Sequence, residues 1–124
     1  MSQYFKYDTD PKLACPCCGE KGMNNGFMLI LDEIRREVKQ PLVINSGYRC
    51  SAENQRVSST GEYGPHTTGR AVDFKCDNSH LRIKLIKAAT KLQLTRIGIA
   101  KSFVHVDNLN AEDDNFPSNV AWLY

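Results

Sequence analysis

The sequence predicts an α+β fold in which helices pack against a small, mostly antiparallel sheet. Two segments space their apolar residues with the period of a helix, and several short runs rich in β-branched residues are typical of strands. Helices and strands do not alternate regularly, and there is no glycine-rich phosphate loop. The chain has 124 residues without repeats or linkers, so residues 1–124 are expected to form a single domain, with residues 1–22 as a cysteine-containing N-terminal segment.

The first half of the chain is expected to hold two helices, one strand and one long loop. Residues 24–39 space apolar side chains three and four positions apart and precede a proline, which predicts a helix. The β-branched run at residues 42–45 predicts a buried strand. Residues 51–58 are expected to form a short helix with Ser51 as its N-cap. Residues 59–70 contain three glycines and a proline, which predicts a long loop of the kind that often carries function.

The second half of the chain is expected to supply most of the sheet. Residues 70–75 alternate in polarity, which predicts a strand with Asp73 on one face. Trp122 and Tyr124 are expected to close the core at the C-terminus. The remaining predicted elements are a helix over 78–93, two strands over 96–100 and 103–107 joined by a tight turn, and an edge strand over 120–124.

The composition excludes several classes of protein. Sixteen Lys and Arg against fourteen Asp and Glu leave a net charge of +2, and the pI of 8.3 lies below the ~9 typical of nucleic-acid-binding domains. The longest apolar run, residues 27–31, is far shorter than the ~20 residues of a membrane-spanning helix. The N-terminus lacks the basic and then apolar layout of a secretory signal, so export by that route is not expected. We expect a monomer that binds neither nucleic acid nor a membrane.

Two segments carry paired histidines and carboxylates, one from His66 to Asp73 and the other from His105 to Asp107. Strand alternation places His105 and Asp107 on one face, and a neighbouring strand can bring Asp73 to face them. A catalytic zinc ion needs three ligands from His and carboxylate side chains and an open position for water. His66, Asp73 and His105 would supply that set; the alternative is a solvated histidine beside ion-paired aspartates.

The order and spacing of three motifs resemble the zinc D-Ala-D-Ala carboxypeptidase family of peptidoglycan peptidases, in its phage and bacterial branch. The motifs are Ser46-Gly47-Tyr48-Arg49, His66-x-x-Gly69-x-Ala71-x-Asp73 and His105-Val106-Asp107. The resemblance covers roughly residues 27–107. It implies a hedgehog-like fold and a zinc metallopeptidase, of carboxypeptidase or endopeptidase type, that hydrolyses an amide bond in the peptidoglycan stem peptide or cross-link. It also implies that His66, Asp73 and His105 bind zinc and that Arg49 contacts substrate or the oxyanion.

The sequence departs from the family pattern at the position of the catalytic carboxylate. Many members place a Glu or Asp three residues before the last histidine, where this chain has Ser102. Serine does not serve as a carboxylate base. Asp107 is therefore expected either to be the catalytic proton acceptor or to orient a metal ligand. The departure also permits a second function, a catalytically inactive, metal-containing module that binds the cell wall.

Several residues around the motifs are expected to contact substrate. The family commonly has a serine two positions before the first ligand, where this chain has Gly64. Either this polar contact to substrate is absent, or Thr67 or Thr68 supplies it. Tyr48 is expected to line a substrate groove with Arg49, although an aromatic residue beside a turn is often part of the core. Arg49 can alternatively form a structural ion pair.

The five cysteines form an odd set, so at least one thiol is free or bound to metal. Cys15-Pro16-Cys17-Cys18-Gly19 contains the C-x-x-C spacing of half a zinc site, whereas Cys50 and Cys76 are single. A second, cysteine-bound zinc ion would require these residues to meet in space; buried thiols or an oxidisable pair are the alternatives.

We expect a phage lysis or tail-associated enzyme, made in the host cytoplasm and acting on the cell wall in the periplasm or as part of a virion. A cysteine-based redox or zinc-scaffold protein is a third hypothesis.

Overall fold

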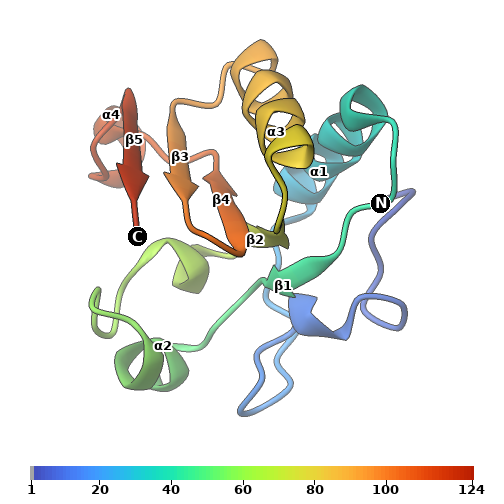
Figure 1. Cartoon of the computed structure of the whole chain (residues 1–124). Coiled ribbons are helices and arrows are strands. Elements are labelled where there is room, and N and C mark those ends of the chain that lie inside the picture. The colour runs from blue at the N-terminus through green and yellow to red at the C-terminus, as the bar shows by residue number, and fades with distance from the viewer. Residues whose placement is uncertain (1) are drawn as a thin grey trace.

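The computed structural model describes residues 2–124 and shows a five-stranded sheet with helices around it (Figure 1). The strand order is β1-β2-β4-β3-β5, and every neighbouring pair is antiparallel except β3 and β5. The predicted α+β class with a mostly antiparallel sheet is confirmed. The elements in chain order are η1 (Pro11–Leu13), α1 (Asn25–Val38), β1 (Ile44–Ser46), α2 (Ser51–Val57), η2 (Pro65–Thr68), β2 (Ala71–Lys75), α3 (Ser79–Lys91), β3 (Arg96–Ile99), β4 (Phe103–Asp107), α4 (Ala111–Asp114) and β5 (Val120–Leu123), where η marks a 3-10 helix.

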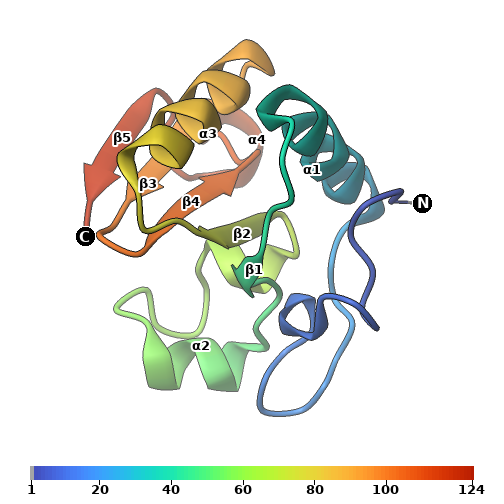
Figure 2. The ribbon, with the colours of Figure 1, turned by 45° about the vertical axis from the view of Figure 1, so that its right-hand side comes forward.

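The sheet has one face for the core and one face for polar chemistry. The two long helices, α1 and α3, lie side by side over one face, while α2 lies on the other side in both views (Figures 1 and 2). Alternate residues of β2 and β4 enter the core beneath α1 and α3, and the residues between them point to the opposite face. The buried core includes Phe27, Leu31 and Ile34 of α1, Val72 and Phe74 of β2, Leu85 and Ala89 of α3, and Val104 and Val106 of β4.

Both long helices begin where the sequence predicts. The side chain of Asn24 accepts a 2.8 Å hydrogen bond from the Phe27 N–H at the start of α1, and Asn78 accepts a 2.8 Å hydrogen bond from the Leu81 N–H at the start of α3. Among residues 2–124, every helix is too short or too polar to span a membrane.

The short helix α2 (Ser51–Val57) lies within the predicted range 51–58, but its N-cap differs from the predicted one. Ser51 is already helical, and Cys50, with an extended backbone, is the N-cap. The Cys50 sulfur accepts the Glu53 N–H at 3.5 Å, which is the contact expected of a capping oxygen. The prediction of Ser51 as N-cap was wrong because the chain turns at Cys50.

The predicted loop over residues 59–70 contains the 3-10 helix η2 and ends at Gly69. Gly69 adopts a left-handed conformation with φ of 73°, and a Cβ atom there would lie 2.1 Å from the carbonyl oxygen of Gly22. Only glycine permits this approach between the end of the loop and the N-terminal segment. The contact sets the position of η2, which carries His66.

The C-terminal strand β5 lies at the edge of the sheet, as predicted, but it does not close the core. Trp122 is partly exposed and lies over Gly98 of β3, where a Cβ atom would come within 2.6 Å of the indole ring. Tyr124 is 66% exposed. Both aromatic rings lie on the polar face of the sheet, because parallel pairing with β3 places Trp122 opposite Gly98.

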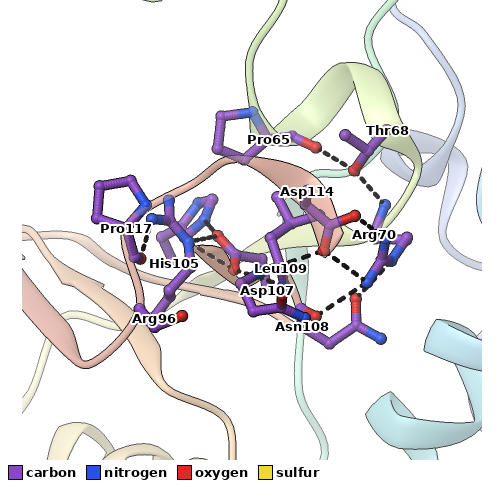
Figure 3. Close-up of polar contacts among 12 residues, drawn as sticks. Pro65, Thr68, Arg70, Arg96, His105, Asp107, Asn108, Leu109, Asp114 and Pro117 are labelled. Atoms are coloured by element: carbon purple, nitrogen blue, oxygen red, sulfur yellow. Dashed lines mark hydrogen bonds and ion pairs between the residues drawn. The ribbon is translucent and has the colours of Figure 1, made fainter. Parts of the chain in front are cut away.

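The segment between β4 and β5 includes α4, which the sequence analysis did not predict. Arg70 fastens this segment to the start of β2, since its guanidinium forms an ion pair with Asp114 and donates hydrogen bonds to the side chain and carbonyl of Asn108 (Figure 3). The bidentate ion pair at 2.6 and 3.2 Å holds the segment against the polar face of the sheet.

Candidate active site

The structure brings His66, Asp73 and His105 together. Strand register places Asp73 of β2 directly opposite His105 of β4, and η2 carries His66 over them. The carboxylate oxygen Oδ1 of Asp73 lies 3.0 Å from His105 Nδ1 and 3.3 Å from His66 Nε2. The three side chains are buried, and their ligand atoms lie within 4.8 Å of one another. This is the donor set of two imidazoles and one carboxylate that zinc prefers.

The backbone orients the imidazole of His66. Its Nδ1 lies 2.7 Å from the carbonyl oxygen of Gly47, and the Arg49 N–H donates to the carbonyl of His66 at 3.2 Å. The Nδ1–H donates to Gly47, so Nε2 is the free nitrogen that faces Asp73. The Ser-Gly-Tyr-Arg segment therefore supports the first predicted ligand from behind.

A buried chain of polar groups orients the imidazole of His105 (Figure 3). Its Nε2 lies 2.7 Å from Oδ2 of Asp107, a fully buried carboxylate that also accepts the Leu109 N–H at 3.1 Å. Arg96 donates from Nε to both oxygens of Asp107, at 2.9 and 3.1 Å, and its NH1 group donates to the Pro117 carbonyl at 2.8 Å. Asp107 thus lies behind His105, at the ring nitrogen that does not face Asp73.

The electrostatics of the cluster follow from these contacts. Burial by itself would raise the pKa of Asp73, but hydrogen bonds with His105 and His66 and their charges hold that pKa far below its usual range. Burial would lower the pKa of His105, but its hydrogen bonds with Asp107 and Asp73 raise it above the ordinary value. The carboxylate is therefore ionised and able to bind a cation at neutral pH.

Arg49 lies at the edge of the cluster and is held there by neutral acceptors. Its Nε donates to Ser46 Oγ at 3.3 Å and its NH1 group to Asn54 Oδ1 at 3.1 Å, while NH2 lies 3.8 Å from Asp73 Oδ2. Asn54, 1% exposed, donates in turn to Thr60 Oγ1 at 2.8 Å. The guanidinium is prepositioned beside the predicted metal ligands and keeps part of its surface in contact with solvent.

The predicted ligands lie in the wall of a cavity of about 650 Å³. This volume is in the range of sites that bind small molecules or short peptides. Among residues 2–124, Asp73 is the only Asp or Glu whose side chain lines the cavity. Aromatic side chains line the side that faces β5: Phe103, Phe116, Trp122 and Tyr124.

Tyr48, Thr67 and Thr68 do not line this cavity, contrary to expectation. The Tyr48 ring packs on the backbone of Gly22 and against the core. The Thr67 hydroxyl donates to the carbonyl of Gly64, the N-cap of η2, at 2.7 Å, and the Thr68 hydroxyl donates to the Pro65 carbonyl at 2.6 Å, so both stabilise η2.

Thr60 occupies the space where the family serine would project. A Cβ atom added at Gly64 would lie 2.2 Å from Thr60 Oγ1, and Thr60 lines the cavity. The polar contact that Gly64 lacks can therefore come from Thr60, across the loop, instead of from Thr67 or Thr68.

Three residues that shape the site were not predicted from the sequence: Asn54, Arg96 and Trp122. The pairing of Arg96 with Asp107 was predictable, because a two-residue turn between the predicted strands 96–100 and 103–107 places these two residues opposite each other. The register of β3 and β4 shows this pairing. The local sequence holds no comparable signal for Asn54, whose partners come from a loop. The same is true of Trp122, which reaches His105 through parallel pairing across β3, with ring centroids 5.3 Å apart.

Comparison with known proteins agrees with this arrangement. A family model described as Peptidase M15 matches residues 5–107, a range that contains all three predicted ligands and Asp107 but not β5. Among solved structures, the Serratia marcescens L-Ala D-Glu endopeptidase ChiX is similar, with a TM-score of 0.54 and 19% identity, over 77% of this chain and 86% of that chain. No curated protein sequence matches. At this identity the structural likeness shows a shared fold.

Proposed function

This chain belongs to the peptidase M15 family, and from that premise we propose that it is a zinc-dependent peptidase that hydrolyses an amide bond in the peptidoglycan stem peptide or cross-link. One observation carries the proposal: ligand atoms of His66, Asp73 and His105 lie within 4.8 Å of one another in the wall of a large cavity. We further propose the setting expected from the sequence, a phage lysis or tail-associated enzyme that acts on the cell wall.

The three residues fit a zinc ion in chemistry and in support. Ligand atoms about 2.0–2.1 Å from a tetrahedral ion lie roughly 3.3 Å apart, close to the 3.0 and 3.3 Å contacts of Asp73 with the two imidazoles. Each imidazole uses its other nitrogen for a hydrogen bond to an oxygen, as metal-binding histidines do. A zinc ion bound there supplies Lewis-acid activation of water and of the scissile carbonyl.

We assign Asp107 the role of positioning His105. Its carboxylate is fully buried, and Arg96, His105 and Leu109 occupy both oxygens. A group that receives a proton from a reacting water must reach the cavity, and Asp107 lies on the opposite side of the imidazole ring from Asp73. The geometry therefore favours the second of its two predicted roles.

Arg49 is proposed to bind the substrate. Its guanidinium is always protonated and can bind two oxygens at once. Ser46 and Asn54 orient it in the cavity wall beside Asp73, where a carboxylate of the stem peptide or the developing oxyanion can accept its remaining N–H groups. Aromatic side chains of β4 and of the C-terminal segment, Phe103, Phe116, Trp122 and Tyr124, add apolar surface to the same cavity.

The lining of the cavity also favours the second candidate function, a metal-containing module that binds the cell wall without cleaving it. Among residues 2–124, no Asp or Glu other than Asp73 lines the cavity, and Ser102 occupies the position where many family members have a carboxylate. A site of this kind binds metal and peptide through the same contacts but lacks a dedicated proton acceptor.

Hydrolysis of purified muropeptides distinguishes the two functions. The panel contains an L-Ala–D-Glu bond, a D-Ala–D-Ala bond and a D-Ala–diaminopimelate cross-link, and mass spectrometry identifies the bond that is cut. The L-Ala–D-Glu bond is tested first because the similar structure is an L-Ala D-Glu endopeptidase. We expect cleavage of one bond that a chelator abolishes and zinc restores.

Matched variants assign the activity to the site. His66→Ala and Asp73→Ala should abolish cleavage, whereas His80→Ala, which changes an exposed histidine on α3, should leave cleavage unchanged. Retention of cleavage in the zinc-free protein would overturn the proposal. Binding to purified cell walls without cleavage of any muropeptide, by a protein with a full metal content, would establish the binding module instead.

A further inference from the structure

Four cysteine sulfurs converge at a second place in the molecule, where the N-terminal segment meets the start of α2. The Sγ atoms of Cys15, Cys17, Cys18 and Cys50 all lie within 4.8 Å of one another. Cys17 Sγ lies 3.6 Å from Cys15 Sγ and 3.4 Å from Cys50 Sγ. The fold thus adds Cys50, distant in the sequence, to the C-x-x-C pair that the sequence shows.

The spacing of these sulfurs suits a tetrahedral metal ion. Sulfur atoms about 2.3 Å from a tetrahedral zinc ion lie roughly 3.8 Å from one another, and four thiolates are a common ligand set of structural zinc sites. A disulfide bond is only about 2.05 Å long, and the Cys17 sulfur lies 3.6 Å from the Cys15 sulfur and 3.4 Å from the Cys50 sulfur. None of the cysteines is in a disulfide within the part of the chain that the structure describes.

Backbone groups orient the ligands, as they do around structural metal sites. Cys15 is buried, and its sulfur accepts the Cys50 N–H at 3.4 Å, while the Cys50 sulfur accepts the Glu53 N–H at 3.5 Å. The Gly19 N–H donates to the Cys15 carbonyl at 2.8 Å, and this hydrogen bond stabilises the turn that contains the C-x-x-C pair. Gly19 adopts a left-handed conformation with φ of 75°, which favours glycine at this position.

We propose that Cys15, Cys17, Cys18 and Cys50 bind a structural zinc ion that fastens the N-terminal segment to the turn supporting the active site. The two segments already pair through the backbone, because the N–H groups of Gly47 and Tyr48 donate to the carbonyls of Lys12 and Leu13 at 2.9 Å. The metal ion would link the same two segments a few residues further along each, at Cys15, Cys17 and Cys18 on one side and Cys50 on the other. Gly47 orients His66, and Arg49 immediately precedes Cys50, so the second ion stabilises the segment that carries both contacts.

Cobalt substitution and elemental analysis test the proposal in the whole protein, purified under reducing conditions. The set comprises the wild type, the pair Cys17→Ser/Cys18→Ser, the pair His66→Ala/His105→Ala, and Cys76→Ser as a matched control outside the cluster. Cys17 and Cys18 are exposed, so their replacement preserves the buried core. Cobalt bound by several thiolates gives intense charge-transfer absorption in the near ultraviolet, which imidazole and carboxylate ligands do not give.

Wild type and Cys76→Ser should contain about two zinc ions per chain and show the cobalt–thiolate band. The cysteine pair should lose one ion and the band, and the histidine pair should lose the other ion and keep the band, so this proposal and the proposed peptidase site fail separately. The cobalt spectrum of the wild type serves as the test if a variant does not fold. The proposal is overturned by a wild type without the band or by iron in place of zinc.

Discussion

The carboxylate of Asp107 lies 2.7 Å from Nε2 of His105, at the ring nitrogen that does not face the other predicted ligands. Because Arg96 neutralises Asp107 from behind, the imidazole is held between a buried ion pair and the predicted metal position. An acidic partner at this position fixes the tautomer of the imidazole and increases its strength as a ligand.

We therefore expect Asp107→Asn to weaken zinc binding at the histidine site by about 10–100-fold, the range found for comparable partners of metal ligands. Competition with a chromogenic chelator measures this affinity. Unchanged affinity combined with loss of turnover at saturating zinc would contradict the positioning role and identify Asp107 as a proton acceptor.

The same substitution leaves the buried Arg96 without its counter-charge, so a loss of about 3–5 kcal/mol of unfolding free energy is expected. The double variant Asp107→Asn/Arg96→Gln removes both charges and should recover stability but not zinc affinity. Recovery of both would show that the affinity loss came from general destabilisation.

Gly98→Ala should destabilise the protein through Trp122. The added Cβ atom would lie 2.6 Å from the indole ring, so the ring or strand β5 must shift, and overpacking of this kind costs about 1–3 kcal/mol. Urea unfolding measures the cost in the wild type and in a Trp122→Ala background. The cost should be smaller without the indole, and an equal cost in both backgrounds would place its origin elsewhere.

Removal of the metal should change the fluorescence of Trp122, the only tryptophan of the chain. Its ring centroid lies 5.3 Å from that of His105, so a change in the charge of the imidazole alters the field at the indole. A chelator should change the emission and zinc should restore it in the wild type and in Cys17→Ser/Cys18→Ser. The response should disappear in His66→Ala/His105→Ala, and a response that persists there would argue against metal binding beside Trp122.

The stability of the metal-free protein should depend on pH through His105. Its pKa in the folded protein is raised by Asp107 and Asp73 even though burial opposes the shift, so its contribution is complete below the unfolded pKa of about 6.5 and is lost as the pH rises through the folded value. Urea unfolding in the presence of a chelator measures this contribution. The stability difference between wild type and Asp107→Asn should shrink as the pH rises above ~6.5; a growing difference would contradict this assignment.

Much of the fold was predictable because it rests on local patterns. The α1 and α3 helices follow from the helical spacing of their apolar residues, and the β3–β4 hairpin follows from two alternating runs around a short turn. Strand alternation also placed Asp73 and His105 on one face, and register set them opposite each other. His66 was predicted from the segment that it shares with Asp73, and the three-motif pattern supported that prediction.

Local sequence patterns determine the two long helices, most of the strands and the residues that can bind metal, namely the His and Asp donors and the C-x-x-C pair. Only the tertiary structure decides which of them meet. Asp107 lies behind His105 because of Arg96, Thr60 fills the space beside Gly64, and Trp122 crosses to the polar face through parallel pairing. Tyr48 packs against the core and not in the site, and the sulfur of Cys50 lies beside those of three cysteines that are more than thirty residues away in the sequence. The periodicity of a sequence indicates which face of each helix or strand is buried. The contacts named here depend instead on strand register and on the paths of loops, which are set by the packing of the whole chain.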